Sequence, residues 1–79
     1  YLKVKLTLAL TSPDLVIEID SKKPQVRDRI LSYLSSLSMA DTKGIAGKEA
    51  IRENIAKRVN RMLSKGKVRD VFFQEFILQ

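Results

Sequence analysis

Residues 60–79 read NRMLSKGKVRDVFFQEFILQ, and this closing stretch decides the fold. A helical segment runs into a glycine, and the β-branched and aromatic run after it predicts a final strand over residues 68–78. Side chains alternate across a strand. One face would carry Val71, Phe73, Glu75 and Ile77, and the other would carry Phe72, Gln74, Phe76 and Leu78. Because both faces are largely apolar, the strand is either covered on both sides or presents its second face to something outside the chain.

The chain opens on a second predicted strand. Over residues 1–10 every even position is leucine or valine and the intervening positions are mostly polar, which is the pattern of a half-buried strand. Residues 13–22 are ambiguous. Ser12, Pro13 and Asp14 favour the start of a helix, whereas the following run from Val16 to Ile19 is mostly β-branched and favours a strand. We lean to a short helix.

Two amphipathic helices are predicted between the strands. Pro24 suits the first turn of one helix. Its apolar stripe has the helical period and consists of Val26, Ile30, Leu31, Leu34 and Leu37. A flexible crossing over residues 38–47 leads to a second helix over residues 48–64, whose buried face carries Ile51, Ile55, Val59 and Met62. Gly66 is expected to end this helix as a left-handed C-cap.

Asn60 lies on the buried side of the second predicted helix, where an amide needs hydrogen-bond partners. It either orients a ligand or bridges backbone groups near Gly66, and we favour the bridge. The resulting order of strand, short helix, helix, helix and strand predicts one α+β domain over residues 1–79. In this domain a small sheet of the two terminal strands packs against two or three helices.

The composition argues against an enzyme. The 79 residues contain no cysteine and no histidine, so the usual thiolate and imidazole groups for metal binding and nucleophilic catalysis are missing. Nine acidic residues are spread among fifteen basic ones. We therefore expect no catalytic residues, no metal site and no cofactor. The net charge of +6 favours an anionic partner (nucleic acid, a lipid headgroup surface or an acidic protein) or simply keeps a small domain soluble.

Gly44-Ile45-Ala46-Gly47 lies between the two predicted helices, where a KH domain carries the GxxG loop that grips a nucleic-acid backbone. No basic residue stands between the two glycines, and Glu49 follows closely. The same residues also suit a plain crossing between helices, which we favour. A small KH-like domain that binds single-stranded nucleic acid is nevertheless the alternative function.

A partner surface can be predicted only in outline. Phe72 and Phe76 either fill the core or contact a partner, and Leu78 lies on the same predicted face. Arg27, within Arg27-Asp28-Arg29, belongs either to an anion-binding patch or to a helix surface with local ion pairs. Arg52 lies on the basic face of the second helix. The candidate interface residues are therefore Phe72, Phe76, Leu78, Arg27 and Arg52, and the candidate structural residues are Pro24, Asn60 and Gly66.

Together these residues resemble a known family. The closing pattern of Asn60, Leu63, Gly66, Val68, Val71, Phe73, Phe76 and Gln79 resembles the ending of the flagellar basal-body-associated protein FliL family. Pro24-Gln25-Val26-Arg27-Asp28 with Ile30 resembles a helix start in that family. Gly47-Lys48-Glu49 with Arg52, and the opening Tyr1-Leu2-Lys3-Val4, are similar to two further parts of it. The run from Val16 to Ile19 departs from the family, which is more helical and acidic there.

The resemblance implies a non-enzymatic accessory protein of the bacterial flagellar motor. Such proteins have a short cytoplasmic piece, one membrane-spanning helix, a linker and a periplasmic domain similar in fold to the stomatin/prohibitin (SPFH) domain. They form ring-like homo-oligomers and associate with the stator proteins MotA and MotB. Because the chain begins with Tyr1 rather than Met, we expect it to be a fragment, and the resemblance implies an inner-membrane anchor upstream. A periplasmic location at the flagellar basal body, and no nucleic-acid partner, follow from the resemblance.

Overall fold

The computed structural model describes the backbone of residues 2–78 and the side chains of residues 2–77. Along the chain the elements are β1 (Leu2–Leu10), α1 (Pro13–Ser21), α2 (Lys23–Ser35), the short 3-10 helix η1 (Ala40–Thr42), α3 (Gly44–Asn60) and β2 (Val68–Leu78). The predicted α+β class and the predicted order of elements are confirmed. The expected strand position of Tyr1 and the terminal Gln79 lie outside the described residues.

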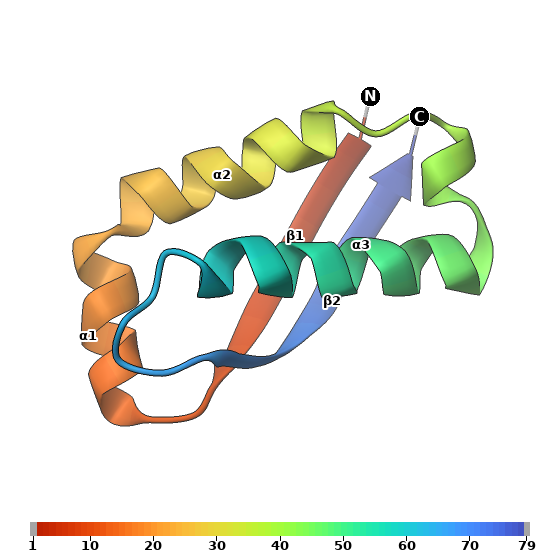
Figure 1. Cartoon of the computed structure of the whole chain (residues 1–79). Helices are drawn as coiled ribbons and strands as arrows, with labels where there is room; N and C mark the ends of the chain where they lie inside the picture. The colour runs from red at the N-terminus through yellow and green to blue at the C-terminus, as the bar shows by residue number, and fades with distance from the viewer. Residues whose placement is uncertain (1, 79) are drawn as a thin grey trace.

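The two strands form one antiparallel sheet, with Leu2 opposite Leu78 and Leu10 opposite Val68. In Figure 1 α3 crosses in front of both strands, α2 runs beside β1 and comes near it only at its C-terminal end, and α1 lies at one end beside the loop that follows α3. Among the described residues no helix lies on the opposite face, which we call the open face. Residues 2–78 therefore cover the sheet on one side only.

Two register shifts decide which side chains of β2 face the helices. Lys5 lies opposite Glu75 and Leu6 lies opposite Phe73, so Gln74 is an extra residue on β2, and a second shift follows Ala9. An extra residue moves every later side chain to the other face. The predicted division of β2 into faces was therefore wrong. The side chains that face the helices are Val68, Val71, Phe73 and Phe76, whereas Phe72 and Ile77 lie on the open face.

The core lies between α3, α2 and the inner face of β2. Ile51, Ile55 and Val59 of α3 are at most 1% exposed, as predicted for this helix, and Val71 of β2 is fully buried. Leu15 is also fully buried, which explains why residues 13–21 form a helix in spite of their β-branched composition: α1 buries one apolar face at the end of the domain.

The predicted stripe of α2 was partly wrong. Leu31 is 50% exposed, and the unpredicted Tyr33 is buried in its place. The reason is that α2 packs against α3 rather than against β1, so the face that carries Val26 and Tyr33 is the one that is covered. The guanidinium of Arg58 on α3 lies 4.6 Å from the centre of the Tyr33 ring. Burial raises the pKa of Tyr33 above its usual value.

The bounds of α3 differ from those predicted. The helix begins at Gly44 and ends at Asn60, so Gly44-Ile45-Ala46-Gly47 forms its first turn rather than a loop. A Cβ on Gly47 would lie 2.8 Å from the Asp41 carbonyl oxygen. This glycine therefore allows η1 to pack closely against α3, and the loop that a KH-like domain would require is absent at these described residues.

Gly66 does not act as the C-cap of α3, because Arg61 takes that position in a right-handed conformation. Gly66 instead lies in the loop before β2 with φ +154°, and a Cβ there would lie 2.9 Å from the Thr11 hydroxyl oxygen. The role of Asn60 is confirmed as a backbone bridge: the Val68 N–H donates to its Oδ1 at 2.6 Å. Pro24 lies in the first turn of α2, as predicted.

Two phenylalanines of β2 provide a test of the shifted register. Phe76→Ala should lower the free energy of unfolding by about 2 kcal/mol or more, because it removes packed apolar surface from the core. Phe72→Ala should cost less than about 1 kcal/mol, because the side chain lies on the open face. Urea denaturation of both variants measures the difference. Equal losses would contradict the placement of the extra residue at Gln74.

Candidate interaction surfaces

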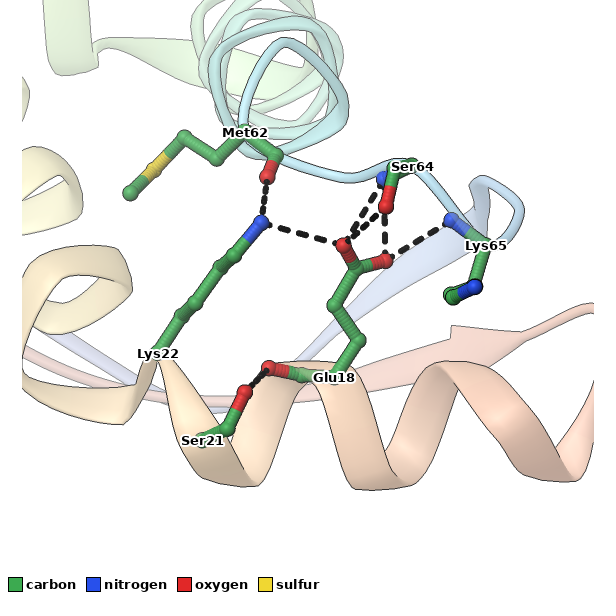
Figure 2. Close-up of polar contacts among 6 residues, drawn as sticks. All are labelled: Glu18, Ser21, Lys22, Met62, Ser64 and Lys65. Atoms are coloured by element: carbon green, nitrogen blue, oxygen red, sulfur yellow. Dashed lines mark hydrogen bonds and ion pairs between the residues drawn. The ribbon is translucent and has the colours of Figure 1, made fainter.

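A cluster of polar contacts joins α1 to the loop between α3 and β2 (Figure 2). Glu18 lies on the inner face of α1 and is only 8% exposed. Its carboxylate points at the backbone of Ser64 and Lys65, more than forty positions away along the chain. We call the contacts of Glu18 and Lys22 with residues 62–65 the Glu18 latch.

Both oxygens of the Glu18 carboxylate accept hydrogen bonds from the loop. The Ser64 N–H donates to each oxygen at 2.9 Å, and the Ser64 hydroxyl donates to Oε2 at 2.7 Å. The Lys65 N–H donates to Oε1 at 2.9 Å. Hydrogen bonds to a charged acceptor are the stronger kind. The loop is therefore held in one position by a single side chain.

Lys22, the residue between α1 and α2, completes the latch. Its Nζ lies 3.0 Å from Oε2 of Glu18 and donates to the Met62 carbonyl oxygen at 2.8 Å. Met62 lies two residues after the end of α3, so Lys22 binds the backbone of the segment that leaves this helix. The latch thus fixes the end of α3 relative to α1.

The electrostatics of the latch are those of a structural contact. The hydrogen bonds from the Ser64 hydroxyl, from the Lys65 and Ser64 backbone and from Lys22 lower the pKa of Glu18 to about 2, and burial opposes them. A general acid or base at neutral pH needs a pKa near 7. Glu18 is therefore a permanent anion that organises the loop, and its chemistry is unsuited to proton transfer.

Sequence reasoning missed Glu18 as a site. Once residues 13–21 are taken as a helix, Leu15, Glu18 and Ile19 share one face with Lys22. A carboxylate on the same face as a fully buried leucine requires partners. The position of Glu18 beside a buried leucine could have indicated that its carboxylate has hydrogen-bond partners. The partners themselves, Ser64 and Lys65, lie too far along the chain to be identified from this pattern.

The open face of the sheet carries the exposed apolar side chains of β2. Phe72 is 51% exposed and Ile77 is 36% exposed. Polar contacts flank them. Nζ of Lys3 lies 3.6 Å from a Glu75 carboxylate oxygen, and the Gln74 amide donates to the Thr7 hydroxyl oxygen at 2.6 Å. Phe72 is thus the one predicted aromatic interface residue that the described structure leaves accessible.

The other predicted interface residues do not join Phe72. Phe76 lies inside, with its ring centre 5.3 Å from that of Phe73 in an edge-to-face arrangement. Arg52 covers Phe73, with its guanidinium carbon 5.4 Å from the ring centre, and it pairs with Glu49. Arg27 is exposed on α2, and its predicted triplet forms no ion pair among the described residues. The side chain of Leu78 lies outside the described residues.

The described residues contain no group of three or more histidine, cysteine, aspartate or glutamate side chains placed to hold a metal ion. Nor does any described helix combine the length and the apolar character that crossing a membrane requires.

The fold defines a small α+β domain with two antiparallel strands and an exposed apolar sheet face. The family described as "Flagellar basal body-associated protein FliL" matches residues 1–79. The chain belongs to this family of flagellar accessory proteins.

Curated relatives agree with the family match. The chain is 33% identical over 79 residues to the flagellar protein FliL of Aquifex aeolicus, covering 100% of the chain and 49% of the relative. It is 28% identical over 78 residues to the flagellar FliL protein of Caulobacter vibrioides, covering 99% and 38%. The flagellar protein FliL of Bacillus subtilis is 31% identical over 62 residues, covering 78% and 44%. The chain therefore spans about half, or less, of the length of these relatives.

The Glu18 latch makes folding stability depend on pH. Because the folded pKa of about 2 lies below the ordinary 4.5, the carboxylate contributes its full stabilisation above about pH 4.5. That stabilisation is lost as the pH falls toward 2. We expect Glu18→Gln to lower the melting temperature at pH 7 and to flatten its decline between pH 5 and 2.

Glu53→Gln is the matched control, because Glu53 is exposed on α3. Asp41 also has a lowered pKa, owing to hydrogen bonds from Ser38, but it remains in both variants and cancels from their comparison. Thermal melts followed by circular dichroism across this pH range provide the measurement. Parallel curves for Glu18→Gln and the unsubstituted chain would contradict the role given to the latch.

Proposed function

We propose that this chain is the periplasmic domain of a flagellar motor accessory protein that acts by binding and not by turnover. It forms a ring-like homo-oligomer and associates with the stator proteins MotA and MotB, where it supports stator activation, torque and motility. An upstream helix holds it at the inner membrane. Family membership supports a location at the flagellar basal body. We also propose that the fold of this domain is similar to that of the SPFH domain.

The main observation in support of the proposal is that no helix of the described residues covers the open face of the sheet. Single exposed apolar residues are ordinary on protein surfaces. Here Phe72 and Ile77 lie on one side of a two-stranded sheet, and α3 packs against its other side. A sheet of two strands is marginal unless it is covered. Cover from a second copy or from a stator protein would bury Phe72 and stabilise the sheet.

A membrane anchor would strengthen such an association without any new contact. Tethering copies to one membrane raises their effective concentration. The isolated domain should therefore self-associate weakly and only when concentrated, whereas the anchored protein should form a stable oligomer. This difference separates a surface built for an anchored ring from one that mediates dimerisation in solution.

The test introduces Phe72→Glu into the full-length, membrane-anchored protein. A carboxylate at the centre of the open face should prevent burial of that face, because an unpaired charge is costly to desolvate. We expect sedimentation in detergent to show an oligomer for the unsubstituted protein and a monomer for the variant. Co-purification with MotA and MotB, and swarm diameter in soft agar, should fall in parallel.

Ile45→Glu is the matched control, because Ile45 is 82% exposed in the first turn of α3, away from the open face. It should leave oligomer size, stator recovery and swarming unchanged. A full-length protein that sediments as a monomer without any substitution would overturn the oligomer proposal. If Ile45→Glu but not Phe72→Glu abolished recovery of the stator proteins, the stator contact would lie at the N-terminal end of α3 and not on the open face.

A further inference from the structure

Three arginine side chains line one hollow where α2 and α3 lie side by side (Figure 1). Arg29 comes from the middle of α2, Arg58 from the last turn of α3, and Arg61 from the position directly after this helix. The hollow has a volume of about 110 Å³. A wider hollow adjoins it and shares Arg29 and Arg58. We call the smaller of the two the arginine hollow.

The positive charge of this hollow is not balanced by the described residues. Arg29, Arg58 and Arg61 form no ion pair with any carboxylate among them. Residues 54–69, which contain the end of α3 and the loop after it, include six lysines and arginines and no aspartate or glutamate. Side chains three positions apart are neighbours on a helix surface. Arg58 and Arg61 therefore repel one another, and Arg29 of α2 adds a third cation beside them.

Arg58 is held in a fixed position. Its guanidinium carbon lies 4.6 Å from the centre of the buried Tyr33 ring, and a cation over an aromatic face is attracted to the ring. The Nε–H of Arg58 is buried and donates to no described residue. A buried donor without an acceptor costs free energy. An anion bound in the hollow would supply an acceptor to a side chain that is already in place.

A simpler explanation accounts for only part of this arrangement. The carboxyl end of a helix carries partial negative charge and favours nearby cations. This effect explains Arg58 and Arg61 at the end of α3. It does not explain Arg29, because Arg29 lies in the middle of α2. Nor does it explain why a donor of Arg58 is buried without an acceptor among the described residues.

From these features we infer that the arginine hollow binds a phosphate group, to whose oxygens Arg29, Arg58 and Arg61 donate hydrogen bonds. A guanidinium presents its N–H donors in a planar fork that matches phosphate and carboxylate oxygens. A carboxylate has only two oxygens, whereas a phosphate group has enough to accept from several guanidinium groups at once. The source of the phosphate group is either the free ion or the headgroup of a phospholipid, which share this chemistry.

The size of the hollow favours a compact ion. A cavity of about 150 Å³ in another protein accepts a single benzene molecule, and the arginine hollow is smaller than that at about 110 Å³. Asp28 lines the wider hollow but not the arginine hollow. Its carboxylate repels an anion from the wider hollow. The phosphate group is therefore confined to the part that the three arginines line.

The first test is a calorimetric titration of the full-length protein, in nonionic detergent, with inorganic phosphate. Sodium chloride holds the ionic strength constant, so that screening is the same throughout. We expect saturable binding, and Arg29→Gln should weaken it at least about tenfold. Arg27→Gln is the matched control, because Arg27 is also exposed on α2 and lines neither hollow. It removes the same charge and should change the affinity less than about twofold.

Two further variants separate a built site from a general effect of net charge. Arg58→Lys keeps the charge and loses the planar fork, so it should weaken phosphate binding about fivefold or more. Asp28→Asn removes the repelling carboxylate and should tighten binding about twofold or more. Circular dichroism checks that each variant is folded. Full affinity in Arg58→Lys, or unchanged affinity in Asp28→Asn, would contradict the inferred arrangement.

The source of the phosphate group is distinguished by three probes. They are inorganic phosphate, a water-soluble short-chain phosphatidylglycerol and a capped peptide of glutamates. Tighter binding of the lipid would assign the site to a headgroup, and tighter binding of inorganic phosphate would assign it to the free ion. Either result supports the inference. Tighter binding of the glutamate peptide than of both would make an acidic protein the partner and would overturn it.

Absence of saturable phosphate binding by the full-length protein would also overturn the inference, as would equal losses in Arg29→Gln and Arg27→Gln. The inference goes beyond the proposed function and is separable from it, because no described strand residue lines the arginine hollow. Phe72→Glu should leave phosphate binding intact. Arg29→Gln should leave the size of the oligomer unchanged.

Discussion

Strands from the two ends of the chain pair with each other, and every helix lies between them in sequence. Bringing such distant segments together costs loop-closure entropy before any contact is gained. A pair of strands alone is too small to recover that cost. The sheet therefore depends on α3, which buries Ile51, Ile55 and Val59 against its inner face, and on the Glu18 latch, which fixes the loop that returns the chain to β2.

The extra residue at Gln74 determines which surfaces the domain presents. With strict alternation, Phe73 and Phe76 would lie on opposite faces, and Phe72 would share its face with Phe76. The shift places both rings against α3, where Lys48 and Arg52 lie over them at 5.4 Å from each ring centre. Phe72 and Ile77 remain outside among polar neighbours. One additional residue thus divides an aromatic strand into a core part and a smaller exposed part.

Local patterns in the sequence predicted most of the fold. The alternation of residues 2–10 and the helical period of α3 depend on neighbouring positions, and both were confirmed. Features set by distant contacts were not predictable in this way. The extra residue at Gln74 becomes visible only when β1 is placed opposite β2, and the buried face of α2 depends on its packing against α3. Phe72 was predicted as a candidate interface residue and is exposed, whereas Glu18 was missed because its partners lie at Ser64 and Lys65.

The exposure of Leu31 follows from the packing of α2. Leu31 belongs to the apolar stripe of this helix and is nevertheless 50% exposed, because α2 packs against α3 and not against β1. An apolar side chain left half exposed in a regular helix is the kind of local conflict expected at functional sites.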